Sequence, residues 1–152
     1  MPNPPVVDPR GPRFGAWITT VVLAVTLVLS SFSPLAVLIL LAAQAVVFGI
    51  GAFFGLGYAP YGLIYRYLVA PRLGPTDERE EAAPPRFAQA VGFGFAVVGV
   101  IGFATGLTPL GLIATALALI AAFLNAAFAF CLGCEVYLLL RRAGVPAFSG
   151  TS

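Results

Sequence analysis

The amino-acid sequence predicts an all-α membrane protein with four transmembrane helices in two consecutive hairpins. Hydrophobic residues make up 60% of the 152 residues, charged residues only 9%, and the mean hydropathy is +0.99. A soluble domain of this size leaves much of its surface in water and cannot hide so much apolar area. Four long apolar segments carry most of that hydrophobicity, and every basic residue lies outside them.

The four expected helices span residues 14–30, 35–54, 87–106 and 110–130. Each is close to the roughly 20 residues that cross a hydrocarbon core of about 30 Å. The first is rich in β-branched residues, which favour a strand in water. In lipid, backbone groups must bond within the segment, so a helix is expected. A cleaved signal peptide is the weaker alternative, because residues 1–13 hold several prolines and Asp8 and the apolar run is long.

The connections follow turn chemistry. Pro34 and Pro109 each follow a short polar break, and proline suits a first helical turn, so they are expected to start the second and fourth helices. Residues 71–86 form the only substantial polar segment, which we interpret as a solvated, largely irregular loop. The chain thus divides into a leader (1–13), one membrane domain (14–142) and a C-terminal tail (143–152).

The arginines predict the orientation of the chain. All eight basic residues are arginines; they precede the first helix, lie between the second and third, or follow the fourth, and the two tight turns carry no charge. The positive-inside rule places the arginine side in the cytoplasm. The expected protein is a multi-pass plasma membrane protein in contact with the lipid bilayer, with both termini cytoplasmic.

The two halves of the sequence share a pattern that suggests a parallel two-helix repeat. Pro12-Arg13-Phe14 opens the first helix and Pro85-Arg86-Phe87 opens the third. Both halves end in a short apolar tail with tyrosine and arginine. Duplication explains this pattern, and so does the common composition of membrane proteins. Each tail is expected to form a short interfacial segment, the second breaking at Gly133 with Tyr137 at headgroup depth.

Small residues predict how the helices pack. The fourth helix places alanines four residues apart, and small residues at this spacing let helix backbones approach closely in a membrane. Asn125 belongs to a neighbouring small-residue strip, so it should face protein. Gln44, near the middle of the second helix, is its expected hydrogen-bond partner. A structural role for these two amides is favoured over a substrate site.

Both cysteines fall in one tetrapeptide, Cys131-Leu132-Gly133-Cys134, followed by Glu135. Under a redox hypothesis, one cysteine attacks a disulfide or a sulfur-carrying substrate and the other resolves the intermediate. Cys131 is the expected attacking residue and Cys134 the resolving one, because the N-terminal cysteine of such pairs is usually the more exposed and the more acidic. Glu135 could shuttle protons, although its charge opposes a nearby thiolate. In a metal reading, two thiolates and one carboxylate are too few for zinc without a second copy of the chain. In a packing reading, both cysteines are small apolar residues.

Several classes of function are excluded or disfavoured. The chain has no histidine, which removes the commonest general base and metal ligand. Gly92-Phe93-Gly94 has no strand before it, which excludes a dinucleotide-binding fold. The net charge of +2 is too small to indicate a nucleic-acid partner. No cofactor and no metal site are expected.

The segment from Asn125 to Tyr137, with its Phe-Cys-Leu-Gly-Cys run, and the opening Pro85-Arg86-Phe87-Ala88 of the third helix resemble a bacterial membrane family catalogued as "domain of unknown function 4395". Residues 7–14 are similar to actinobacterial members. The resemblance covers nearly the whole chain and carries over the cysteine pair as the family motif. It implies thiol or sulfane-sulfur chemistry, because members are often encoded near thioredoxin-like and rhodanese-type sulfurtransferase proteins.

The resulting hypothesis is a membrane partner in thiol–disulfide or sulfane-sulfur handling. Cys131 and Cys134 are the expected reacting pair, and Glu135, Asn125 and Gln44 are supporting candidates. Thioredoxin-like or rhodanese-type proteins are the expected partners, and a homo-oligomer is possible. The alternative is a non-catalytic membrane subunit or a small-solute permeation protein whose cysteines only pack.

Overall fold

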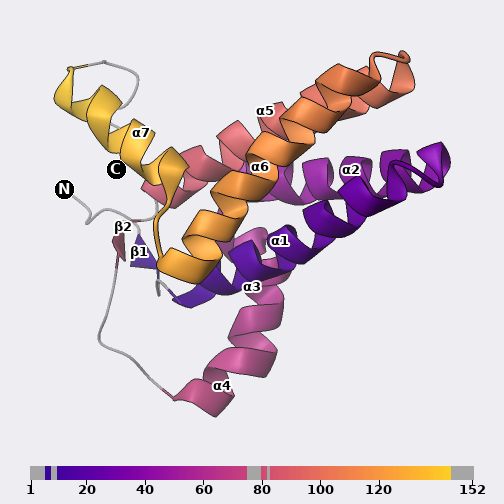
Figure 1. The fold of residues 1–152 in the computed structure, drawn as a ribbon. Helices are drawn as coiled ribbons and strands as arrows, with labels where there is room; N and C mark the ends of the chain where they lie inside the picture. The colour runs from indigo at the N-terminus through magenta and orange to yellow at the C-terminus, as the bar shows by residue number, and fades with distance from the viewer. Residues whose placement is uncertain (1–5, 8–9, 75–79, 82, 145–152) are drawn as a thin grey trace.

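The computed structural model of the protein describes residues 6–7, 10–74, 80–81 and 83–144 (Figure 1). Four of the described helices are long and apolar enough to cross a membrane, which confirms the predicted fold class. They are α1 (Arg10–Leu29), α2 (Pro34–Gly49), α5 (Ala83–Ala104) and α6 (Thr108–Phe128). A π-helical stretch, η1 (Ile50–Phe54), continues α2, so that the second span ends at Phe54.

The spans form two hairpins packed into one bundle. Helix α6 packs against α1 and α5, α5 also packs against α2, and α1 meets α2. The core between them is built from Leu23, Leu41, Ala45, Phe48, Ala96 and Ala118. Helices α5 and α6 approach to backbone contact, because a Cβ on Gly102 would lie 2.5 Å from the Gly111 nitrogen. Ala114, Ala118 and Ala126 of the predicted alanine row are buried, which confirms the expected packing through small residues, and Gly111 adds a contact that was not expected.

The two ends of the bundle differ in character. The α1–α2 and α5–α6 turns lie together at one end, on the right of Figure 1. The described arginines belong to the starts of α1 and α5 and to the segments that follow the second and fourth spans, at the opposite end, which we call the arginine end. Proline opens α2 and stands in the first turn of α6, as predicted for Pro34 and Pro109.

The ends of the helices differ from the predicted boundaries. Helix α1 begins at Arg10, so Arg10 and Arg13 belong to the helix and not to a leader. The segment expected to be an irregular loop includes part of a short helix, a strand and the first turn of α5, where Pro84 and Pro85 are buried. Proline fits a first helical turn because the missing N–H has no partner there in any case. Strands β1 (Val6–Val7) and β2 (Glu80–Glu81) pair antiparallel.

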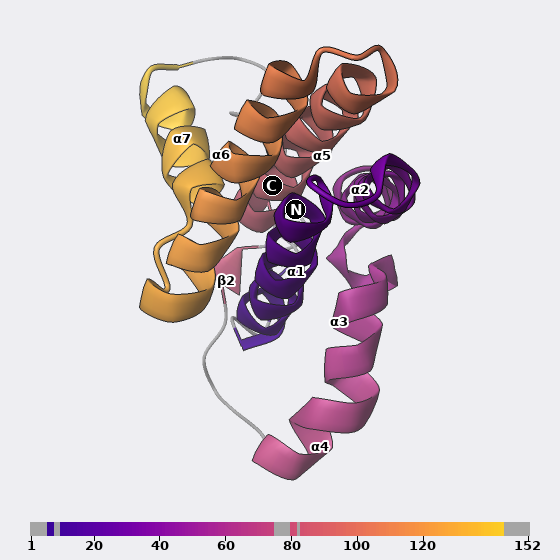
Figure 2. The same ribbon diagram turned by 45° about the vertical axis from the view of Figure 1, so that its right-hand side comes forward.

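Two helical tails follow the second and fourth spans. After Gly55, whose φ is +118°, the first tail comprises η2 (Leu56–Tyr58), α3 (Pro60–Ile64), η3 (Tyr65–Val69) and α4 (Ala70–Leu73). After Ala129 the second tail is the single helix α7 (Leu132–Arg142). Figures 1 and 2 show both tails at the arginine end, with α4 and α7 on different sides of the bundle. Of the expected C-terminal tail, 143–152, only the first two residues lie within the described part.

The two halves repeat the same contacts. Phe14 stacks against Tyr65 with ring centroids 5.9 Å apart and planes tilted by 45°. Phe87 stacks against Tyr137 at 5.7 Å and 49°. The arginine before each phenylalanine also acts alike, as Arg13 donates to the Ala126 carbonyl oxygen at 3.0 Å and Arg86 to that of Ala52 at 2.9 Å. Each arginine therefore reaches the last turn of a span in the other half, as expected for a parallel two-helix repeat.

Candidate functional site: the Cys131–Cys134 pair

A disulfide joins Cys131 to Cys134 across the start of α7, with the two Cα atoms 5.1 Å apart. The pair lies where the chain leaves α6 and turns into α7. Helix α6 ends at Phe128, and the next residue, Ala129, has a φ of +56°. The Phe130 N–H then donates to the Leu124 carbonyl oxygen at 3.1 Å, a closure typical of helix C-termini. The break therefore precedes both cysteines, and the prediction that it falls at Gly133 is wrong.

Cys131 is the N-cap of α7. Its backbone is extended (φ −89°, ψ 105°), and its Sγ accepts the N–H of Cys134 at 3.1 Å. Serine, threonine or aspartate usually fills this place, because the first N–H groups of a helix have no partner within the helix. The same groups and the helix dipole favour a negative charge at the N-terminus. A cysteine at such a position generally favours the thiolate over the thiol.

Gly133 brings the pair against the start of α5. A Cβ placed on Gly133 would lie 2.6 Å from both the Cα and the Cβ of Ala88, so no larger residue fits without moving a helix. One turn later Tyr137 is 2% exposed and stacks on Phe87. Tyr137 is thus a packing residue of the bundle, and its expected position at headgroup depth stays a prediction. The Ala88 contact was missed because alanine carries no distinguishing sequence signal.

The first half supplies a comparison that lacks sulfur. Six residues before Tyr137 stands Cys131, and six residues before Tyr65 stands Ala59. Ala59 is likewise the extended N-cap of a helix, α3, at φ −65° and ψ 135°, but with no side-chain cap. Gly62 takes the place of Cys134. The break and the new helix therefore form in the first half without a disulfide.

Of the supporting candidates, only Glu135 adjoins the cysteines. It lies exposed in the first turn of α7, where its N–H donates to the Cys131 carbonyl oxygen at 3.0 Å. Asn125 lies in the last turn of α6, and its backbone carbonyl accepts the N–H of Ala129 at 3.0 Å. Asn125 therefore helps to close α6 through its backbone.

Gln44 belongs to a different group, between α1, α2 and α3. Its Oε1 accepts the Tyr61 hydroxyl at 2.7 Å, and its Nε2 donates to Thr19 Oγ1 at 3.5 Å. The predicted pairing of Gln44 with Asn125 is therefore wrong, because the first tail returns Tyr61 to the bundle. Burial raises the pKa of Tyr61 above its ordinary value of 10.0, so the hydroxyl stays protonated as a donor.

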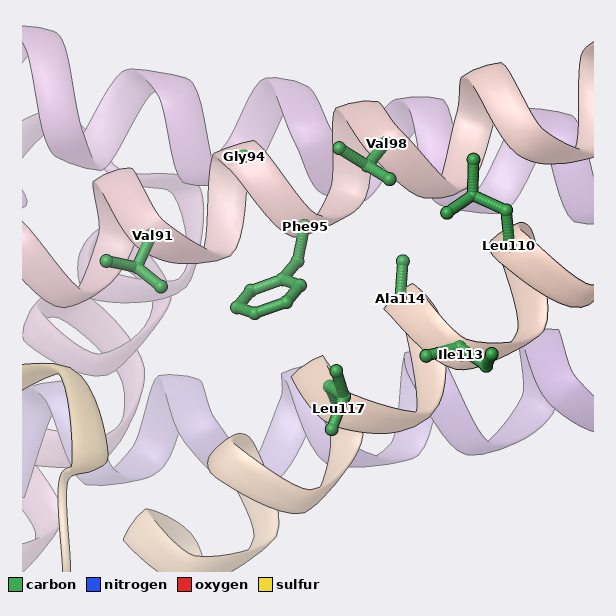
Figure 3. Close-up of a pocket in the computed structure, with 8 residues that line it drawn as sticks. All are labelled: Val91, Gly94, Phe95, Val98, Leu110, Ile113, Ala114 and Leu117. Atoms are coloured by element: carbon green, nitrogen blue, oxygen red, sulfur yellow. The ribbon is translucent and has the colours of Figure 1, made fainter.

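A groove between α5 and α6 is apolar throughout (Figure 3). Phe95 projects into the space between the two helices, and Gly94 above it has no side chain. The lining comprises Val91, Gly94, Phe95, Val98, Leu110, Ile113, Ala114 and Leu117. Such a lining offers a hydrated solute no hydrogen bond, so this groove gives no support to a permeation role.

The described residues contain no cluster of three or more histidine, cysteine or acidic side chains that could hold a metal ion. Zinc bound through Cys131 and Cys134 would need further ligands from outside this part of the chain.

Comparison with known proteins identifies the family. Neither the curated proteins nor the solved structures include a match to the chain. The model of a domain of unknown function, DUF4395, matches residues 7–142, which include the four membrane-spanning helices and the cysteine pair. The chain therefore belongs to the DUF4395 family.

Proposed function

We propose that the protein carries out thiol–disulfide or sulfane-sulfur exchange through Cys131 and Cys134, at the cytoplasmic face of the plasma membrane. One observation carries the proposal: the pair is joined by a disulfide at a helix N-terminus, with Cys131 Sγ accepting the N–H of Cys134. The disulfide is a bond that can undergo exchange. The helix N-terminus also stabilises the Cys131 thiolate, which can act as the attacking or the leaving group.

In thiol–disulfide exchange, the reduced protein begins as two thiols. The Cys131 thiolate attacks one sulfur of a substrate disulfide, forms a mixed disulfide and releases the other substrate sulfur as a thiolate. The Cys134 thiolate then attacks Cys131 Sγ, which forms the intramolecular disulfide and releases the second substrate thiolate. The pair loses two electrons and two protons, and the substrate gains them.

Sulfane-sulfur exchange uses the same two thiols. The Cys131 thiolate attacks the terminal sulfur of a persulfide, which leaves a persulfide on Cys131 and a thiol on the donor. Attack of Cys134 on Cys131 Sγ then expels hydrosulfide and closes the disulfide. Two electrons pass from the pair to the transferred sulfur, so one persulfide yields one thiol and one hydrosulfide.

Two further observations support exchange over a packing role. The equivalent break in the first half forms with Ala59 and Gly62, so sulfur is not needed to build it. The arginines favour a cytoplasmic location for this end, and cytoplasmic disulfides in most organisms are catalytic or redox-sensing and seldom structural. Thioredoxin-like or rhodanese-type proteins, which carry exchangeable thiols or sulfane sulfur, suit this chemistry as partners.

The test is the redox response of the pair in native membranes, read as alkylation mass shifts. We expect the pair to change between oxidised and reduced forms on addition of a reduced thioredoxin-like protein or a persulfide. Cys134→Ser should accumulate a mixed disulfide on Cys131, whereas Cys131→Ser should accumulate much less. If the thiols stay unreactive under oxidant, or the double cysteine-to-alanine variant keeps full function in cells, a non-catalytic membrane subunit replaces this proposal.

A further inference from the structure

Helix α7 divides its surface into three lengthwise strips. One strip, which includes Gly133 and Tyr137, packs on α5. A second strip is apolar and exposed: Leu132 is 37% exposed, Val136 45% and Leu139 61%. The third strip carries the charged side chains of Glu135 and Arg142, with Leu138 between them along the helix.

The spacing fixes where the disulfide faces relative to these strips. Leu132, Val136 and Leu139 follow the i, i+4, i+7 pattern of one helix face. At about 100° per residue, Cys134 falls roughly 170° around the helix from the middle of the apolar strip. Cys131 is bonded to Cys134 and lies at the helix start. The exposed apolar strip and Cys134 are thus on opposite sides of the helix.

The apolar strip is continuous with the lipid-facing surface of the bundle. Helix α6 exposes Ile113, Leu117 and Ile120 along its length, as a membrane span does. Phe128 and Phe130, 68% and 44% exposed, carry this apolar surface across the break to Leu132. Figure 1 shows α7 leaving the bundle at an angle to α6, at the arginine end. A helix with one apolar face and separate charges, set at the end of a span, is typical of the membrane interface.

From this arrangement we infer that α7 lies in the membrane surface with Leu132, Val136 and Leu139 in contact with lipid acyl chains, and that it holds the disulfide toward water. This orientation also assigns the substrate class, a step that rests on the proposed exchange function. The reacting thiol, disulfide or persulfide arrives from the aqueous phase, and a lipid-dissolved oxidant such as a quinone does not reach the pair.

Two adjacent leucines make a matched test of the orientation. Trp17 is the only tryptophan, so Trp17→Phe gives a silent background. Leu139→Trp places an indole on the apolar strip, and Leu138→Trp places one about 100° away, toward the charged side chains. In liposomes, brominated lipids should quench the Leu139→Trp variant about twofold or more above the Leu138→Trp variant, and aqueous iodide should show the reverse order. Equal quenching, or a Leu139→Trp variant reached by neither quencher, overturns the lipid-facing assignment.

A second measurement tests the substrate class. The reduced protein in liposomes is exposed either to glutathione disulfide in water or to a short-chain benzoquinone dissolved in the bilayer. We expect glutathione disulfide to oxidise the pair about tenfold faster, with Cys134→Ser as the control that cannot close the disulfide. A faster quinone reaction overturns the inference. If the tryptophan pattern holds but neither reagent closes the disulfide, the orientation stands and the proposed exchange function fails.

Discussion

Gly133 lies directly against Ala88, at a point where α7 crosses the start of α5 with no space for a side chain. A methyl group added at Gly133 would come within 2.6 Å of the Ala88 Cα. This contact holds the cysteine pair onto the bundle, because Cys131 and Cys134 flank Gly133 on either side.

Gly133→Ala should therefore force α7 away from α5 and destabilise the fold by about 1–3 kcal/mol, the usual cost of overpacking. The measurement is the free energy of unfolding in mixed micelles. Gly94→Ala is the matched control, because a Cβ at Gly94 meets nothing within 4 Å. Addition of Ala88→Gly to Gly133→Ala should restore only part of the loss, because it removes the contact with the Ala88 Cβ but leaves the Cα at 2.6 Å; full restoration would show that the backbone contact does not limit this position.

Arg13 and Arg86 each cap the end of a span in the other half, and removing either of these arginine caps should have a similar effect on stability. Arg13→Gln and Arg86→Gln each remove a charged donor from a backbone carbonyl at the end of a span, at Ala126 and Ala52. Hydrogen bonds to charged groups contribute about 1.5–3 kcal/mol, so both variants should unfold more easily by similar amounts. Arg142→Gln, at an exposed position on the last turn of α7, is the control and should change stability little. A large difference between the first two variants would count against equivalent roles in the two halves.

Reactivity should differ between the cysteines once the disulfide is removed. In Cys134→Ser, the remaining Cys131 thiolate still faces the N-terminus of α7, so it should be alkylated faster at neutral pH than Cys134 in Cys131→Ser. Iodoacetamide labelling rates across a pH series measure this difference. The same rate for both single thiols would remove the assignment of Cys131 as the attacking residue.

Tyr61 predicts a stability change at alkaline pH. The pKa of its phenol is raised in the folded protein by burial, so the folded state keeps its proton to a higher pH than the unfolded state does. Stability from this group is complete below the unfolded value of about 10 and falls as the pH rises from there toward the folded pKa. Tyr61→Phe should lose the hydrogen bond to Gln44 at neutral pH and show a shallower decline above pH 10. Parallel pH curves for the two proteins would contradict this role of Tyr61.

The sequence predicted the membrane spans because length and hydropathy decide them. Pro34 and Pro109 fall in first helical turns, and helices end within a few residues of the expected places. The position of the cysteine pair after the fourth span also followed from counting residues. These features depend on the local composition of the chain, which can be taken directly from a single sequence.

The features that the sequence did not predict depend on contacts between distant segments. Gly133 was expected to break the helix, because glycine disfavours helices, but its use is the close approach to Ala88, while Ala129 takes the left-handed conformation. Gln44 was assigned to Asn125 because both are amides within spans. Its partner Tyr61 returns to the bundle through the break after Phe54; the sequence indicates that a helix ends there but not which way the following segment turns.

The crossed arginine caps also constrain how the protein is made. Ala52 lies in the last turn of the first hairpin, yet the guanidinium that binds its carbonyl belongs to Arg86, which is translated later. Arg13 is synthesised first, and its hydrogen bond to the Ala126 carbonyl forms only after more than a hundred further residues have been translated. The first hairpin is therefore incomplete when it enters the bilayer, because Arg86 caps its end only when the second hairpin arrives. Insertion thus produces an intermediate that assembly of the second half must complete.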